Sequence, residues 1–372
     1  MGGILFISSY NTGYGHISIT EAVREQLALL GPSTEVHEAD AFMLGGKASY
    51  TMSRLYNKVA VNTPLLWKIC YSFGNIFPSL VKYFSVQSIK KKFTELINKT
   101  NPGLIVVVHP GYVRSVMDLL DDMGIKTPVV SMVADLDNIS HLWADRRCAY
   151  TLCPTEASRS TLLRLSIADE KIKVFGFPVR DKFNHFNPSE DSRPLSRISS
   201  KEGLTFLIMN GSQGLKSVEK ISGVLLRAFS CRVIILAGNN AKVKSSLEKS
   251  LLPEFGDRIT IHGFVKNVEY HMSISDILII RASPNVLMEA VNLCKPVIVT
   301  GSLTGQEEKN PDFVADNNLG AVCRDINALP DIVNGLLCNN GSRLNEIYRH
   351  QISFRRTCAA KNIAEFFLSI VE

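Results

Sequence analysis

Short runs of consecutive apolar residues recur along the chain, each followed by a turn-forming loop and a helical pattern. Such runs are typical of strands that are buried on both faces of a parallel sheet. We expect strands at 4–8, 35–39, 105–108, 128–133 and 150–154, and in the second half at 204–209, 232–237, 259–261, 277–280 and 296–300. The repeated order of strand, loop and helix predicts an α/β fold with two parallel sheets.

Length and one polar interruption predict the domain organisation. At 372 residues the chain is too long for one small core, so we expect two domains. Residues 184–201 are polar, with two prolines and several serines, and we interpret them as a linker. The sequence therefore predicts a first domain at 1–183, a second at 202–343, and terminal helices at 344–372.

The segment 275–310 predicts a complete strand–turn–helix–strand unit. Ser283 stands directly before Pro284. Serine is a common helix N-cap, and proline is favoured at the first helical position, so a helix is expected to begin at Pro284. The turn between strand and helix presents backbone N–H groups and the positive end of a helix dipole, which bind phosphate well. The unit therefore predicts an anion site, although an ordinary capped βαβ unit would show the same pattern.

Three polar residues of this segment suit a sugar nucleotide. Glu289 lies just beyond the first helical turn, where its carboxylate can accept hydrogen bonds from a ribose diol. Gln306 and Glu307 follow the next predicted strand and provide groups suited to sugar hydroxyls. We interpret the segment as one that can hold a nucleotide sugar.

A second glycine-containing loop, S-Y-N-T-G-Y-G-H at 9–16, joins the first predicted strand to a helix at 17–30. Gly13 and Gly15 permit close approach of the backbone to a ligand. His16 stands at the start of the helix, and a helix N-terminus disfavours a charged imidazole, which suits a general base. A histidine that merely begins a helix is the alternative interpretation.

These motifs resemble the monogalactosyldiacylglycerol synthase and processive diacylglycerol glucosyltransferase family. R-A-S-P-N-V-L-M-E-A at 281–290 is similar to the family pattern K-A-G-P-G-T-I-x-E-A, and G-Q-E-E-K-N at 305–310 to G-Q-E-x-G-N. The loop at 9–16 is similar to S-D-T-G-G-G-H, and residues 174–183 match V-x-G-x-P-V-x-x-x-F. Tyr14, Ser283 and Asn285 stand where the family has glycines.

The resemblance implies an inverting GT-B glycosyltransferase with two Rossmann-like domains facing each other across a cleft, and a final helix that crosses back to the first domain. UDP-glucose or UDP-galactose would bind to the second domain and a lipid would accept the sugar. His16 would be the general base, with Asp135 as a second candidate or as a residue that orients His16. Residues implied in donor binding are Gly13, Gly15, Asn210, Gly211, Ser212, Gly214, Phe264, Arg281, Ser283, Pro284, Asn285, Glu289, Gln306 and Glu307. Phe264 would pack against uracil, and core packing is its alternative role.

Charge and aromatic residues are concentrated in one window. Residues 41–94 hold eight Lys or Arg, no Asp or Glu, and ten of the thirty aromatic residues, in a chain whose net charge is +6. Basic and aromatic side chains together are typical of surfaces that bind anionic lipid. We expect the acceptor and the membrane to contact Trp67, Phe73, Phe77, Lys90, Lys91, Lys92 and Trp143. A helical region with an aromatic core and a solvated basic face is the alternative.

The remaining composition narrows the class of protein. No run of eighteen apolar residues exists, and the first residues lack the pattern of a signal peptide. Eight cysteines without C-x-x-C pairs indicate neither a zinc site nor a disulfide framework. Together with the basic aromatic window and the resemblance, this predicts a cytoplasmic protein that is peripherally associated with the inner face of the cell membrane and binds no nucleic acid. Because helix N-termini would stabilise the departing diphosphate, we expect no cofactor or metal to be needed.

Three other functions remain open from the sequence. They are a GT-B transferase acting on a soluble small molecule, an isomerase of the UDP-sugar 2-epimerase type, and a regulator that binds UDP-sugar with little turnover. The basic aromatic window favours a lipid acceptor over a soluble one.

Overall fold

The computed structural model describes residues 2–10, 14–47, 49–51, 53, 78–137, 139–184, 203–209 and 214–372. The chain divides into two compact units. Unit 1 comprises Met1–Asp181, Leu303–Lys309 and Arg356–Glu372, and unit 2 comprises Lys182–Ser302 and Asn310–Arg355. Three separate segments thus build unit 1. The chain returns to unit 1 at Arg356, later than the boundary at 344 that the sequence predicts.

Unit 1 is built on a six-stranded parallel sheet with strand order β2-β1-β3-β4-β5-β6. Its strands are β1 (Ile4–Ser8), β2 (Val36–Asp40), β3 (Leu104–Val107), β4 (Val129–Met132), β5 (Tyr150–Cys153) and β6 (Ile172–Val174). Ile4 pairs with Val36 on one side and with Leu104 on the other, so β1 is an internal strand of the sheet. Every residue of β1, β3 and β4 is buried, as the apolar runs predict for strands covered on both faces.

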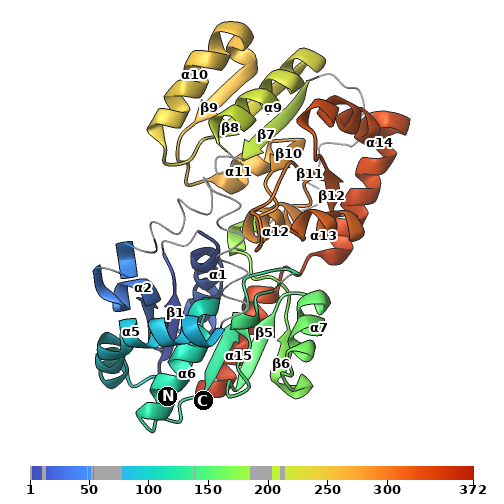
Figure 1. Cartoon of the computed structure of the whole chain (residues 1–372). Coiled ribbons are helices and arrows are strands. Elements are labelled where there is room, and N and C mark those ends of the chain that lie inside the picture. The colour runs from blue at the N-terminus through green and yellow to red at the C-terminus, as the bar shows by residue number, and fades with distance from the viewer. Residues whose placement is uncertain are drawn as a thin grey trace. The chain divides into compact units, whose positions relative to one another are not determined.

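Helices pack around this sheet (Figure 1). They are α1 (Tyr14–Leu30), α2 (Ala41–Leu44), α5 (Pro78–Thr100), α6 (Val113–Asp122), α7 (Glu156–Arg164) and α15 (Ala359–Val371), with the short 3₁₀ helices η1 (Pro110–Tyr112), η2 (His141–Trp143) and η3 (Asp169–Lys171). The helix α1 begins at Tyr14, earlier than predicted, so His16 lies in its first turn.

The final helix completes unit 1. In Figure 1 the red helix α15 lies among the blue and green elements of that unit, although it ends the chain. Its Phe367 is fully buried and meets Phe6 of β1 edge-on, with ring centroids 6.1 Å apart. Gly176 has φ +97°, and a Cβ there would lie 2.6 Å from Cβ of Arg356. The glycine of the 174–183 motif thus allows the chain to pass the start of α15, and the predicted return of the last helix is confirmed.

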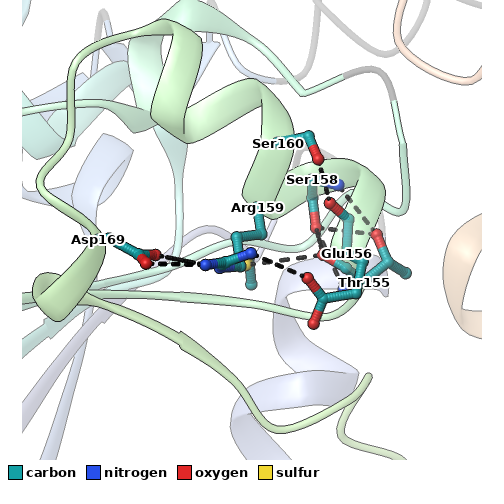
Figure 2. Close-up of polar contacts among 7 residues, drawn as sticks. Thr155, Glu156, Ser158, Arg159, Ser160 and Asp169 are labelled. Carbon is teal, nitrogen blue, oxygen red and sulfur yellow. Dashed lines mark hydrogen bonds and ion pairs between the residues drawn. The ribbon is translucent and has the colours of Figure 1, made fainter.

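The start of α7 is fixed by a capping box (Figure 2). Thr155 accepts from the Ser158 amide and Ser158 Oγ accepts from the Thr155 amide, both at 3.1 Å. Arg159 holds the carboxylate of Asp169 through two nitrogens and also approaches Glu156 (Figure 2). Thr155 Oγ1 donates to the carbonyl of Leu136, which ties α7 to the loop after β4. That loop carries Asp135.

Unit 2 contains a second six-stranded parallel sheet, with order β12-β11-β10-β7-β8-β9. Its strands are β7 (Leu204–Met209), β8 (Cys231–Leu236), β9 (Ile259–His262), β10 (Ile277–Ile280), β11 (Val297–Val299) and β12 (Gly320–Val322). Its helices are α9 (Leu215–Ala228), α10 (Ala241–Phe255), α11 (Val268–Ser273), α12 (Pro284–Asn292), α13 (Asn310–Asp316) and α14 (Leu329–Phe354). The predicted fold class, an α/β protein with two parallel sheets, is confirmed.

All ten predicted strands are present, and two further strands were not predicted. Both, β6 and β12, are three-residue strands at a sheet edge. Their sequences, I-K-V and G-A-V, are too short to form a recognisable apolar run. Among the described helices, none is long and apolar enough to cross a membrane.

Candidate functional site

Four adjacent strands of unit 1 bring polar residues to one edge of the sheet. His16 follows β1, Asp40 ends β2, His109 follows β3, and Asp135 follows β4. Carboxyl ends of parallel strands meet at the same edge, where ligands of α/β proteins bind. All four side chains are buried. Polar groups gathered in this way at the carboxyl edge make it the candidate active site of unit 1.

His16 is held as a neutral imidazole. It is 6% exposed, and burial lowers its pKa to about 4. A hydrogen bond to the backbone of Val108 raises the pKa of His16 in part, as expected when the ring N–H donates to a carbonyl. Nδ1 has no hydrogen-bond partner among the residues that the structure describes. The ring therefore carries its proton on Nε2 and has a lone pair on Nδ1 that no described residue uses, as a general base requires.

Asp135 is the centre of a buried hydrogen-bond network. Its Oδ2 accepts from the indole nitrogen of Trp143 at 2.8 Å, and its Oδ1 accepts from the side-chain amide of Gln306 at 2.9 Å. Burial raises the pKa of Asp135, and the two hydrogen bonds partly offset that effect. Both oxygens are thus occupied by neutral donors. Their arrangement suits an anchor for Trp143 and Gln306 better than a proton acceptor.

Trp143 requires a correction to the sequence analysis. It was grouped with residues that contact the membrane, but the structure buries it completely. Its ring centroid lies 6.3 Å from that of His16, and its N–H is used by Asp135. An indole with a buried N–H needs such an acceptor. Trp143 therefore supports the His16 site from within and does not reach a membrane surface.

Two residues of this edge were given no role from the sequence. The ring of His109 lies 5.0 Å from that of His16 and 5.3 Å from that of Phe42. Asp40 accepts from the backbone amides of Tyr10 and Met43, and so joins the loop after β1 to the start of α2. The only sequence signal for either residue is its place directly at the end of a predicted strand.

The loop Leu303–Lys309 belongs to unit 1, although β11 and α13 on either side of it belong to unit 2. Gly305 has φ +88°, a conformation that favours glycine. Glu307 is 5% exposed, and its carboxylate accepts from the amide of Leu303 within the same loop. Of the two donor-site candidates here, Gln306 contacts Asp135 and Glu307 stabilises the loop itself.

In unit 2 the turn between β10 and α12 has the predicted form. Ser283 is the N-cap residue in an extended conformation and Pro284 begins the helix, although the Ser283 side chain makes no capping hydrogen bond. The amide of Ala282 donates to the carbonyl of Gly301, and the side-chain amide of Asn310 donates to the carbonyl of Ala282, both at 2.8 Å. These two hydrogen bonds tie the turn before α12 to the segment after β11 and to the start of α13.

The other described donor-site candidates of unit 2 lie around strand ends. Glu289 is 5% exposed on α12, while Arg281 and Asn285 are half-buried beside Ser283. Gly214 precedes α9 with φ +90°. Phe264 follows β9 and is 55% exposed, so the alternative reading of this residue as a core residue is wrong.

Several candidates lie outside the described residues. They are Gly13, Asn210, Gly211, Ser212, Trp67, Phe73 and Phe77. Gly15 is described and lies half-buried in the first turn of α1. Within the described ranges, no three His, Cys, Asp or Glu side chains gather as a metal-binding group.

The predicted basic surface is seen on α5. Lys90, Lys91 and Lys92 are exposed, whereas Ile89 and Phe93 are fully buried. Lys90 pairs with Asp122 at 3.3 Å, so one acidic residue from another helix reaches this surface. The helix therefore has an apolar core face and an outer face that carries Lys90, Lys91 and Lys92.

Comparisons with known proteins relate this chain to glycolipid-forming enzymes. Residues 16–179 match the family model of monogalactosyldiacylglycerol (MGDG) synthase. The chain is 25% identical over 358 residues to the processive diacylglycerol beta-glucosyltransferase of Bacillus subtilis, covering 90% of this chain and 87% of that protein. It is also 25% identical over 334 residues to a probable monogalactosyldiacylglycerol synthase 2 of Oryza sativa subsp. indica, covering 85% and 69%.

Solved structures show the same fold at low identity. Acinetobacter baumannii MurG has a TM-score of 0.62 and 12% identity, covering 99% of this chain and all of that one. A UDP-GlcNAc 2-epimerase from Neisseria meningitidis has a TM-score of 0.63 and 15% identity, with the same coverage. The predicted resemblance is confirmed: the chain is similar in sequence to monogalactosyldiacylglycerol synthases and to processive diacylglycerol glucosyltransferases, and it has the two-domain α/β fold of GT-B glycosyltransferases.

Proposed function

We propose that this protein is an inverting hexosyltransferase that moves glucose or galactose from a UDP-sugar to a diacylglycerol-type lipid. The relatives named above are glycosyltransferases whose names contain diacylglycerol. The observation in the molecule that supports the proposal is the neutral, buried His16, whose Nδ1 has no hydrogen-bond partner among the residues that the structure describes. The proposed place of the reaction is the cytoplasmic surface of the cell membrane.

In the proposed reaction, His16 accepts the proton of the lipid hydroxyl at Nδ1. The hydroxyl oxygen forms a bond to the anomeric carbon while the bond from that carbon to the diphosphate oxygen breaks, and UDP leaves. A single displacement of this kind inverts the configuration of the anomeric carbon. General-base assistance of this type contributes about 10²- to 10⁴-fold to a rate.

Unit 2 would hold the nucleotide. Ser283, Pro284 and Asn285 form the N-cap and the first residues of α12, where backbone amides and the helix dipole favour a diphosphate anion. Glu289 would accept hydrogen bonds from the ribose, and the exposed ring of Phe264 would stack on uracil. The N-terminus of α12 supplies positive potential to the leaving diphosphate from the protein itself, so we propose that no metal or other cofactor is required.

Gln306 and Asp135 would act together on the donor sugar. Because Gln306 uses its NH₂ group on Asp135, its carbonyl oxygen is the part that can accept from a sugar hydroxyl. Asp135 thus fixes which end of the amide is presented. We propose a positioning role for Asp135 and a sugar-binding role for Gln306.

The lysines of α5 would attract the protein to anionic lipid, where its acceptor is found. Each basic residue near an anionic surface contributes about 1 kcal/mol. The exposed Lys90, Lys91 and Lys92 would give reversible and salt-sensitive binding.

The test is incubation with UDP-glucose or UDP-galactose and liposomes that contain diacylglycerol, followed by mass spectrometry of the lipids and of the nucleotide. A monohexosyl lipid and free UDP are expected, and His16→Gln should abolish most of the product. A UDP-sugar converted to its epimer without lipid product would indicate the isomerase instead. Transfer to a soluble alcohol but not to lipid would contradict the lipid acceptor.

A further inference from the structure

A second buried histidine lies beside the proposed base. His109 is 7% exposed, and its ring centroid lies 5.0 Å from that of His16, with 52° between the ring planes. Phe42 meets the His109 ring edge-on at 5.3 Å, and Tyr112 lies at 5.6 Å. Three aromatic neighbours therefore fix the ring in the candidate site, and none of the roles assigned so far uses it.

The tautomer of His109 follows from a hydrogen bond between its ring and the backbone. The amide of Gly111 donates to Nδ1 of His109 at 3.2 Å, which makes His109 the N-cap of η1. A nitrogen that accepts a hydrogen bond carries no proton, so the neutral ring has its proton on Nε2. Burial, together with the neighbouring His16, keeps the pKa of His109 well below its usual value. His109 is thus a neutral hydrogen-bond donor.

The two histidines are complementary. His16 offers a lone pair at Nδ1, which has no partner in the described part of the chain, and His109 offers an N–H at Nε2. Buried polar groups need hydrogen-bond partners. One hydroxyl can satisfy both, because it has a proton to donate and two lone pairs to accept with. After accepting one hydrogen bond, its oxygen keeps a second lone pair with which to attack a carbon.

We propose that His109 is an acceptor-orienting residue, whose Nε2–H holds the oxygen of the lipid hydroxyl while His16 takes the proton of that hydroxyl. This assignment rests on the proposed glycosyl transfer. Both histidines are attached to the same strand end, because His16 bonds the backbone of Val108 and His109 is the next residue. Their relative position is therefore set by the end of β3 and does not depend on the donor.

Two substitutions separate this role from a purely structural one. His109→Asn keeps an acceptor for the Gly111 amide, since Asn is a good N-cap, but loses the distal donor. His109→Gln places an N–H near the former Nε2 but loses the short capping acceptor. An orienting role predicts that His109→Asn lowers kcat/KM for diacylglycerol by about three- to tenfold, the range for one neutral hydrogen bond. His109→Gln should then retain most of the activity.

The opposite order, with His109→Asn normal and His109→Gln impaired, would show that His109 only caps η1 and would overturn the proposal. Equal activity of both variants and the wild-type protein would overturn it as well. UDP affinity and Tm are measured for each variant, and neither should change in His109→Asn. If the wild-type protein transfers no sugar to lipid, the proposed function fails, and the same pair is compared in hydrolysis of the UDP-sugar, where water replaces the lipid hydroxyl.

A measurement without turnover tests the tautomer directly. In ¹⁵N NMR spectra of the histidine side chains, Nδ1 of His109 should be unprotonated and Nε2 protonated at pH 7, with His109→Asn providing the assignment. A proton on Nδ1 would remove the donor and overturn the proposal, whichever substrate the enzyme uses.

Discussion

Gln306 donates its side-chain amide to Asp135, a residue 171 positions earlier in the chain, at 2.9 Å. The second oxygen of the same carboxylate accepts from Trp143. A buried carboxylate with two neutral donors is stable only while both donors remain, because an unpaired buried polar group costs about 1–3 kcal/mol, and more when it is charged. The loop of Gln306 and the loop of Asp135 should therefore be energetically coupled.

A double-mutant cycle measures this coupling. Asp135→Asn and Gln306→Met should each lower the free energy of unfolding of unit 1 by about 1.5–3 kcal/mol, since each leaves a buried group without its partner. The double variant should be more stable than the sum of the two predicts, with a coupling of about 0.5–3 kcal/mol. Both tryptophans of the chain lie in the segment Met1–Asp181, so fluorescence during urea unfolding reports that segment. Strict additivity would contradict the contact.

His16 should make stability depend on pH. Its pKa in the folded protein is about 4, below the ordinary value of 6.5, so the unfolded chain binds the proton first as pH falls. The contribution of His16 to the free energy of unfolding is fully present above pH 6.5. It is lost as pH falls towards 4, and the total loss is ~3 kcal/mol. His16→Gln removes the titration and keeps a side-chain N–H for the Val108 carbonyl.

The measurement is urea unfolding at several pH values between 4.5 and 7.5 for both proteins. Other titrating groups, including Asp135, contribute to both curves, so the difference between the curves isolates His16. The wild-type protein should lose stability more steeply below pH 6.5 than the variant. Parallel curves would mean that His16 is solvated and titrates normally.

Glu289 should control nucleotide affinity. Glu289→Gln replaces the proposed ribose acceptor by a neutral amide of the same size, and loss of a hydrogen bond to a charged group is worth about 1.5–3 kcal/mol. UDP affinity, measured by calorimetry, should fall by about ten- to a hundredfold. Glu248→Gln on α10 of the same unit is the matched control. Unchanged UDP affinity with a normal Tm would exclude Glu289 from the donor site.

The lysines of α5 should control binding to vesicles. The wild-type protein should sediment with phosphatidylglycerol vesicles at low salt and be released by salt, because surface attraction is screened. Changing Lys90, Lys91 and Lys92 to Glu should abolish sedimentation. The control variant changes the exposed Lys220, Lys242 and Lys249 of unit 2 to Glu, which alters the net charge equally. If both variants lose binding to the same extent, net charge rather than this helix is responsible.

Gly176 should be sensitive to the smallest side chain. Gly176→Ala adds a Cβ 2.6 Å from Cβ of Arg356 at a φ of +97°, which side chains rarely adopt. Backbone strain of this kind costs about 1–3 kcal/mol, and the contact adds to it. We expect a lower Tm and faster proteolysis at the residues before α15. Gly124→Ala is the control. Gly124 has φ +68°, and a Cβ added there lies in open space, so this variant introduces backbone strain without a contact like that with Arg356.

The strands were predictable because burial on both faces requires an apolar run. The predicted strand 277–280 coincides with β10, since Asp276 and Arg281 bound four aliphatic residues. The helix α1 was predicted to begin at Ile17 because the apolar periodicity begins there, yet it starts at Tyr14. The spacing of apolar residues within one segment thus predicts that a helix forms there but not the residue at which the helix begins.

The partners within the candidate site were not predictable. Asp135 was expected to act as a base or to orient His16, and nothing near it in the sequence indicates a contact with Gln306. Trp143 was grouped with the residues that contact the acceptor and the membrane, whereas its buried indole N–H donates to Asp135. Such pairings depend on which strand ends become neighbours, and hydrophobic patterns carry no information on that.

The discontinuity of unit 1 has a consequence for biosynthesis. The sheet of unit 1 is made first by the ribosome, but the loop Leu303–Lys309 and the helix α15 that complete it are made much later. Unit 2 can fold in the interval, since all its segments precede Arg356. Until α15 emerges, the faces of β1 and α1 that it covers stay exposed to solvent or to a chaperone. A nascent chain should therefore acquire unit 2 before a complete His16 site, the reverse of the order in which their first strands are translated.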